Sequence, residues 1–133
     1  MHLIVCIDDR DGMSFLGRRL SRDREVIAHI LRLTKGSNLW VSPYTSKLFP
    51  EGSVLVAGEF QHAAEAGDYC FVENAVLPDV YGKLESVILY RWNRRYPSTV
   101  KFPREILESM RRESLEDFKG FSHETITMER YLP

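Results

Sequence analysis

Cysteine, proline and glycine are all scarce in this sequence, with 2, 6 and 8 residues among 133. Two cysteines cannot build a dense disulfide framework, and Cys6 and Cys70 both lie in apolar runs typical of buried strands. We therefore expect reduced cysteines that act as packing residues. They lack Cys-x-x-Cys spacing, and no His-x-His or His-Glu-x-x-His motif occurs, so no metal site is predicted. The four histidines are scattered: His2, His29, His62 and His123.

Neither sign of charge dominates, because 18 Lys and Arg residues face 19 Asp and Glu residues for a net charge of -1. General attraction to DNA or to an anionic membrane is therefore not expected. No window approaches the roughly 20 apolar residues of a membrane span, and the first apolar run is too short for the core of a signal peptide. We expect a cytoplasmic protein without a membrane or DNA partner.

The length and the hydrophobic content of 44% fit one compact domain over residues 1–133. The continuous apolar run Leu3 to Ile7, followed by Asp8 and Asp9, is typical of a central strand that is buried on both faces. From Ser21, a capping residue, apolar side chains recur at spacings of three and four up to Leu33, which predicts a helix on one face of the sheet.

Strands and helices alternate along the rest of the chain. Further strands are expected at 39–41, 54–57, 69–72 and 86–92, and short helices at 61–66 and 78–84. Two runs near the end, 110–118 and 125–131, alternate apolar and polar residues and predict an antiparallel pair. The sequence therefore predicts a single-domain α/β fold, with a mostly parallel sheet and antiparallel strands at its C-terminal end.

The order of several segments carries a resemblance. An apolar strand, a loop with Gly12-Met13 and the helix start Leu20-Ser21-Arg22-Asp23 are followed later by Phe102-Pro103. In this order the chain resembles the dihydrofolate reductases and the related reductase domains of riboflavin biosynthesis. The resemblance implies a dihydrofolate reductase-like fold and places Asp23 at the family's substrate carboxylate. The chain also resembles small bacterial proteins labelled ribonuclease Z, but that enzyme's His-x-His-x-Asp-His metal motif is missing.

The departures from the reductase pattern lie on the cofactor side. Ser42-Pro43-Tyr44-Thr45-Ser46 replaces the family's phosphate-gripping Gly-Arg-x-Thr-Trp, and Val72-Glu73-Asn74 replaces its Gly-Gly turn. Glu73 is expected to repel a pyrophosphate. Only Pro50 to Ser53 separate Phe49 from Val54, so the family's adenosine-binding segment is shortened. No cofactor is expected. Binding of NADPH would require contacts to its phosphates other than those that the family's motifs supply.

Asp23 has two interpretations. At a helix start, in a cleft lined by Ile7, Ile27 and Ile30, it could contact a flat amino-heterocycle such as a pterin as a substrate-binding carboxylate. Alternatively it belongs to the helix cap. Tyr90 stands where the family has a threonine that supports the acid, so it lines or fills this pocket.

Arginines form a second candidate site. Arg18, Arg19, Arg22 and Arg24 lie in the loop and at the helix start, and Arg91, Arg94 and Arg95 surround Trp92 and Tyr96. They could converge on an anion, or form ordinary solvated pairs with the neighbouring acids. Ser122 and His123 are adjacent in an expected turn with no evident orienting acid, and we interpret them as exposed polar residues.

The sequence favours a small-molecule or partner-binding module that lacks the usual NADPH site, with a small heterocyclic or anionic ligand. One alternative is an NADPH-dependent reductase of a pterin or a riboflavin precursor, in which Asp23 assists proton delivery. A second alternative is an RNA-binding protein that uses Arg91 to Tyr96. Whether the chain is an enzyme stays open, and an exposed Trp92 or an uncovered sheet edge could support a homodimer.

Overall fold

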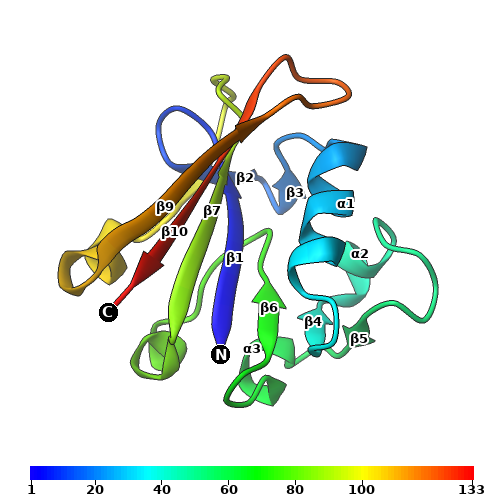
Figure 1. Cartoon of the computed structure of the whole chain (residues 1–133), viewed down its shortest axis with the longest axis vertical. Coiled ribbons are helices and arrows are strands. Elements are labelled where there is room, and N and C mark those ends of the chain that lie inside the picture. Colours follow the sequence, from blue (N-terminus) through cyan, green and yellow to red (C-terminus); the bar gives the residue numbers. More distant parts are fainter.

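The computed structural model describes all 133 residues. Its main sheet is built around β1 (His2–Ile7), which lies between β6 (Tyr69–Phe71) and β7 (Ser86–Arg91) and pairs with both in parallel. Figure 1 shows β1 in the middle of the molecule. The prediction of a central first strand is confirmed.

The main sheet has seven strands in the order β5-β4-β6-β1-β7-β10-β9. The first five run parallel, whereas β10 is antiparallel to β7 and β9 is antiparallel to β10. The outer strands are β5 (Leu55–Val56), β4 (Leu39–Val41), β10 (Ile126–Leu132) and β9 (Arg111–Phe118). The predicted mostly parallel α/β sheet with antiparallel strands at its C-terminal end is therefore confirmed.

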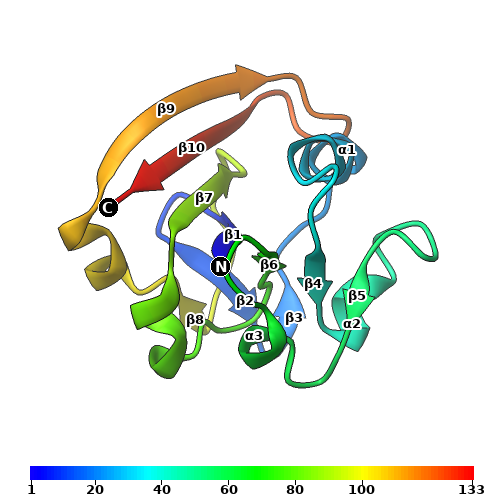
Figure 2. The same cartoon turned by 60° about the horizontal axis from the view of Figure 1, so that its bottom comes forward.

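Alternation along β1 divides the core into two. Leu3, Val5 and Ile7 pack on one face of the sheet, while Ile4 packs on the other with the buried residues of α1 (Arg24–Leu33). Figure 2 shows α1 on one side of the sheet. The helix covers one face, as its apolar spacing predicts.

The opposite face is covered by a second sheet, in the order β3-β2-β8, and by short helices. These elements are β2 (Gly12–Phe15), β3 (Arg18–Arg19), β8 (Val100–Lys101), α3 (Phe60–Ala63) and the 3₁₀ helices η1 (Pro78–Lys83) and η2 (Arg104–Ser109). The sequence suggested only a polar loop where β2 and β3 form a hairpin. Strands of two to four residues are too short for a periodic signal.

Two other local differences bear on function. The first helix begins at Arg24, and Asp23 rather than Ser21 caps it. A four-residue helix, α2 (Pro43–Ser46), follows β4 and was not expected from the sequence. The link 50–53 holds no helix or strand, in keeping with the shortened segment expected there. No helix has the length and apolar character needed to cross a membrane.

Candidate functional site

Asp23 caps α1 and also holds a distant loop. Its backbone is extended, with φ -152° and ψ 125°, and its Oδ1 accepts a hydrogen bond of 2.8 Å from the backbone N–H of Glu25. The same carboxylate accepts hydrogen bonds of 2.9 to 3.1 Å from the backbone N–H groups of Phe121, Ser122 and His123. Figure 1 shows this β9–β10 loop beside the start of α1. The capping interpretation of Asp23 is therefore confirmed.

The charge of Asp23 is strongly stabilised. Burial by itself would raise its pKa, but the hydrogen bonds from Phe121, from the side chain of His123, and from Glu25 and Ser122 outweigh that cost and hold the pKa well below the usual carboxyl range. Asp23 is ionised at neutral pH, and both of its oxygens are engaged within the protein. Its role as a ligand contact stays a prediction, and it would require the loop to give up these bonds.

His123 has contacts that the sequence did not reveal. Its Nδ1 lies 2.9 Å from Oδ2 of Asp23, so an orienting acid is present after all. Its Nε2 lies 3.0 Å from the hydroxyl of Ser21 and 3.2 Å from that of Tyr96, and its ring stacks on Trp92 at 4.7 Å. His123 is buried, so the interpretation of an exposed polar turn residue is wrong. Since Asp23 and His123 are far apart in the sequence, no local pattern could link them.

The three isoleucine positions do not share one cleft. Ile27 and Ile30 both belong to α1: Ile30 is fully buried against the sheet, and Ile27 lines two surface hollows beside the helix. Ile7 belongs to the core on the other face of the sheet. The reason is the pleat, because successive side chains of a strand point to opposite faces.

Tyr90 fills space beneath α1. Its ring is completely buried, and its hydroxyl makes a hydrogen bond of 2.7 Å with Nδ1 of His29. Nε2 of His29 in turn lies 3.1 Å from Glu116 on β9. Tyr90 thus occupies core volume and lines none of the larger clefts.

The largest cleft, of about 490 Å³, lies where β4 and β6 end. At its wall, Glu73 forms a two-pronged ion pair with Arg19, with two N···O distances of 2.9 Å, and accepts a hydrogen bond of 2.8 Å from the hydroxyl of Thr45. The guanidinium of Arg19 also lies over the ring of Tyr44, 4.2 Å from its centroid. The Nε–Nη2 edge of Arg19 and the carboxylate of Glu73 are thus engaged with each other.

The lining of this cleft contains no lysine or arginine. It includes two acids, Glu59 and Glu73, and two aromatic rings, Tyr44 and Phe60. The Ser14 hydroxyl donates a hydrogen bond of 2.7 Å to Oδ1 of Asn74, and the Nδ2 group of the same amide donates to no group of the protein. The remaining lining residues are Gly17, Ser42, Thr45, Gly58, Gln61, Val72, Ala75 and Leu77.

A second cleft, of about 340 Å³, runs along α1 and has the opposite character. Three cations, Arg22, Arg24 and Lys47, line it together with apolar side chains such as Ile27 and Leu31. The guanidinium of Arg24 also lies 3.5 Å from the centroid of the Phe121 ring.

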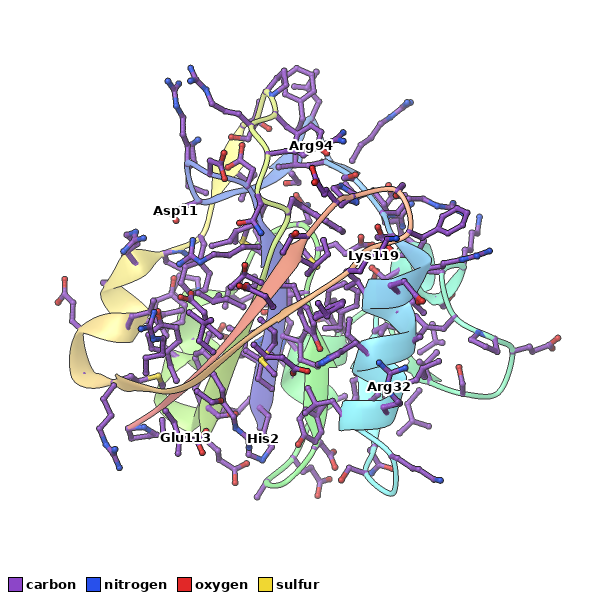
Figure 3. The ribbon with its side chains drawn as sticks, turned by 45° about the horizontal axis from the view of Figure 1, so that its top comes forward. His2, Asp11, Arg32, Arg94, Glu113 and Lys119 are labelled. Carbon is purple, nitrogen blue, oxygen red and sulfur yellow. The ribbon has the colours of Figure 1, made fainter.

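The predicted arginine cluster is largely divided among separate partners. Arg19 binds Glu73, and Arg91 binds Glu129 at 2.7 Å, while Arg18 is exposed on the β2–β3 hairpin. Figure 3 shows Arg94 at the same end of the molecule as Asp11. Trp92 is buried in the core, as expected of a packing residue, which excludes the alternative of an exposed Trp92 that stacks on a base or supports a dimer.

Neither cysteine forms a disulfide. Burial raises the pKa of Cys70 to about 12, so its thiol stays protonated at neutral pH and behaves as an apolar packing group. No group of three histidine, cysteine, aspartate or glutamate side chains gathers closely enough to hold a metal ion.

The arrangement of the strands matches a solved structure. A dihydrofolate reductase from Enterococcus faecalis, in complex with NADP(H) and RAB-propyl, superposes with a TM-score of 0.69 over 98% of this chain and 94% of that chain. The chain has a dihydrofolate reductase-like fold. The sequences are only 9% identical, so the likeness concerns the fold alone. No family model and no curated protein sequence matches the chain.

Proposed function

We propose that this protein binds a small heterocyclic molecule in the 490 Å³ cleft at the ends of β4 and β6, and that it lacks the phosphate grip of an NADPH-dependent enzyme. The carboxyl ends of parallel strands are the usual position of ligand sites in α/β folds. The cleft volume lies within the range that holds a drug-sized molecule. The dihydrofolate reductase structure of the same fold is a complex with NADP(H) and RAB-propyl, so this fold is compatible with small-molecule binding.

The observation that supports this proposal most is the charge of the lining. Glu59 and Glu73 contribute carboxylates, and no cation lines the cleft. A pyrophosphate would lose its hydration without gaining a positive partner, which disfavours NADPH. An uncharged or cationic ring fits better, since Tyr44 and Phe60 offer aromatic surface and Asn74 offers a free N–H donor.

The test is a thermal-shift titration with two sets of compounds. One set is phosphorylated or anionic: NADPH, NADH, FMN and dihydrofolate. The other is uncharged or cationic: adenosine, 2-aminopterin-type rings and aminopyrimidines. A ligand present at about 100 times its Kd should stabilise the protein by about 2.7 kcal/mol. Stabilisation by the uncharged set alone supports the proposal, and stabilisation by NADPH contradicts it.

Gly58 allows the site to be checked by a filling variant. A side chain at this position would meet nothing within 4 Å and its backbone has no positive φ, so Gly58→Phe should fold while it occupies the cleft. Gly82→Phe is the matched control, because Gly82 is equally open and lies in η1, outside the cleft. Ligand stabilisation should disappear in Gly58→Phe and persist in Gly82→Phe. Equal stabilisation of both variants would exclude this cleft.

A reductase of a pterin or riboflavin precursor is the second candidate, because the solved reductase shares the fold and carries NADP(H). This candidate predicts that the protein oxidises NADPH when such a substrate is present, which a fall in absorbance at 340 nm would show. RNA binding through Arg91 to Tyr96 has lost its main support, since Trp92 is buried. A mobility shift that weakens with salt would restore it.

A further inference from the structure

We propose that Ser21, His123 and Asp23 form a nucleophile, base and acid triad, and that the protein hydrolyses small acyl esters that carry an anionic group. The hydroxyl of Ser21 lies 3.0 Å from Nε2 of His123, and Nδ1 of the same ring lies 2.9 Å from Oδ2 of Asp23. These are the connections and distances that an activated serine requires. The triad is separate from the cleft of the proposed function, so each idea is tested independently.

The acid and the base are held in place before any substrate arrives. A carboxylate only accepts hydrogen bonds, so Nδ1 of His123 carries the hydrogen and Nε2 is left as an acceptor that faces the hydroxyls of Ser21 and Tyr96. Backbone N–H groups of Glu25, Phe121 and Ser122 fix the carboxylate of Asp23. Stacking on Trp92 at 4.7 Å fixes the plane of the imidazole. Such rigid support is what a general base needs.

Ser21 is partly exposed, next to small hollows in the protein surface. It lies in the segment between β3 and α1, is half-buried, and lines two small hollows together with Cys6, Glu73 and Trp92. One of these hollows shares four residues with the 340 Å³ cleft along α1: Arg22, Asp23, Ile27 and Leu48. A molecule held in that cleft would therefore lie next to the serine.

The reaction would proceed in two balanced steps. Oγ of Ser21 attacks the acyl carbon while Nε2 of His123 takes the hydroxyl proton, and that proton then passes to the departing alkoxide as the ester C–O bond breaks. Water next attacks the acyl-serine, giving its proton to Nε2, and Ser21 regains a proton as the carboxylic acid leaves. The backbone N–H groups of Ser21 and Arg22 donate to no acceptor in the protein, so they are free to bind the developing oxyanion.

The adjacent cleft indicates the class of substrate. Arg22, Arg24 and Lys47 line it, while its one carboxylate, Asp23, is already engaged. Ile27, Leu31 and Leu48 add an apolar surface. A short acyl chain that ends in a carboxylate would place its charge on the cations and its ester carbonyl toward Ser21.

The first experiment uses a fluorophosphonate probe, which bonds covalently to activated serines, and intact-protein mass spectrometry followed by peptide mapping. The wild-type protein should gain one adduct on Ser21, and Ser21→Ala should gain none. Ser37→Ala is the matched control, because Ser37 is exposed beyond the other end of α1, and it should label like the wild type. An unlabelled wild-type protein, or an adduct that survives in Ser21→Ala, would overturn the proposal.

The second experiment measures hydrolysis of 4-nitrophenyl acetate and of 4-nitrophenyl hemisuccinate, which carries a free carboxylate. Ser21→Ala should lower kcat about 100-fold or more on both esters. The double variant Arg22→Ala, Arg24→Ala should raise KM about tenfold more for the hemisuccinate than for the acetate. Equal effects on both esters would contradict the anionic substrate class, and an unchanged rate in Ser21→Ala would contradict the triad.

Discussion

His123 and Asp23 are joined by a hydrogen bond of 2.9 Å although 100 positions separate them in the sequence. Their side chains are 3% and 0% exposed. This contact ties the β9–β10 loop to the first turn of α1. The carboxylate of Asp23 therefore both caps the helix and holds the loop in place. Breaking it should therefore affect two distant parts of the molecule at once.

Asp23→Asn is expected to lower the free energy of unfolding by about 3 to 5 kcal/mol at pH 7, because an amide cannot match the charged acceptor and directs N–H groups at backbone donors. Urea unfolding followed by circular dichroism measures this change. A loss under about 1 kcal/mol would mean that the loop is held mainly by other contacts.

The same residue should make the protein sensitive to acid. Its folded-state pKa is depressed, so its contribution to stability is present above the unfolded carboxyl pKa of about 3.9 and is lost as the pH falls below that value. Wild-type stability should thus decline more steeply between pH 5 and pH 2 than that of Asp23→Asn. Parallel pH curves for the two proteins would refute this assignment.

Gly120→Ala should destabilise the protein by about 1 to 3 kcal/mol. A Cβ at this position would lie 2.6 Å from the carbonyl oxygen of His123 and 2.7 Å from Oδ2 of Asp23, and neither atom can move without disturbing the loop anchor. Gly82→Ala provides the control, because its Cβ would meet nothing within 4 Å and should change stability by no more than about 0.5 kcal/mol. Thermal unfolding of both variants separates the two effects.

The Arg19–Glu73 pair should show measurable coupling. Its side chains are 19% and 10% exposed and make two bonds of 2.9 Å, so the interaction is better shielded than an ordinary surface pair. A double-mutant cycle with Arg19→Gln and Glu73→Gln should give a coupling energy of about 1 to 3 kcal/mol. Strict additivity would show that solvent screens the pair.

Tyr90→Phe should cost about 1 kcal/mol, because it removes the hydroxyl that binds His29 and leaves the ring packing unchanged. Tyr69→Phe serves as the comparison, since the hydroxyl of Tyr69 makes no hydrogen bond within the protein. Chemical denaturation should show a larger loss in the free energy of unfolding for Tyr90→Phe than for Tyr69→Phe. An equal loss for both variants would mean that the Tyr90–His29 hydrogen bond does not stabilise the fold.

The parts of the fold that could be predicted are those with long periodic patterns. The run Leu3 to Ile7 marked a central strand, and the spacing from Val26 to Leu33 marked the helix on one sheet face. The period of two along β1 also carried the information that Ile4 and Ile7 face opposite ways. Grouping Ile7 with Ile27 and Ile30 overlooked that signal.

The candidate sites were harder to predict, because they depend on pairs that only the folded chain brings together. Nothing near Ser21 or His123 in the sequence marks the other, and Arg19 lies 54 positions from Glu73. The expectation that Glu73 repels a phosphate stays a prediction, and the sequence did not indicate that Arg19 pairs with this carboxylate. Short elements such as β3 and β8 contain too few residues for any pattern to be recognised.

The position of β1 has a consequence for how the chain reaches its native state. Both strands that flank β1 occur later in the sequence, and the loop that completes the α1 cap occurs later still. During synthesis at about 5 to 20 residues per second, one edge of β1 stays unpaired until β6 has left the ribosome, and the other edge stays unpaired until β7 has followed. We expect slow folding dominated by long-range contacts, and a nascent chain that depends on chaperones to keep β1 from aggregating.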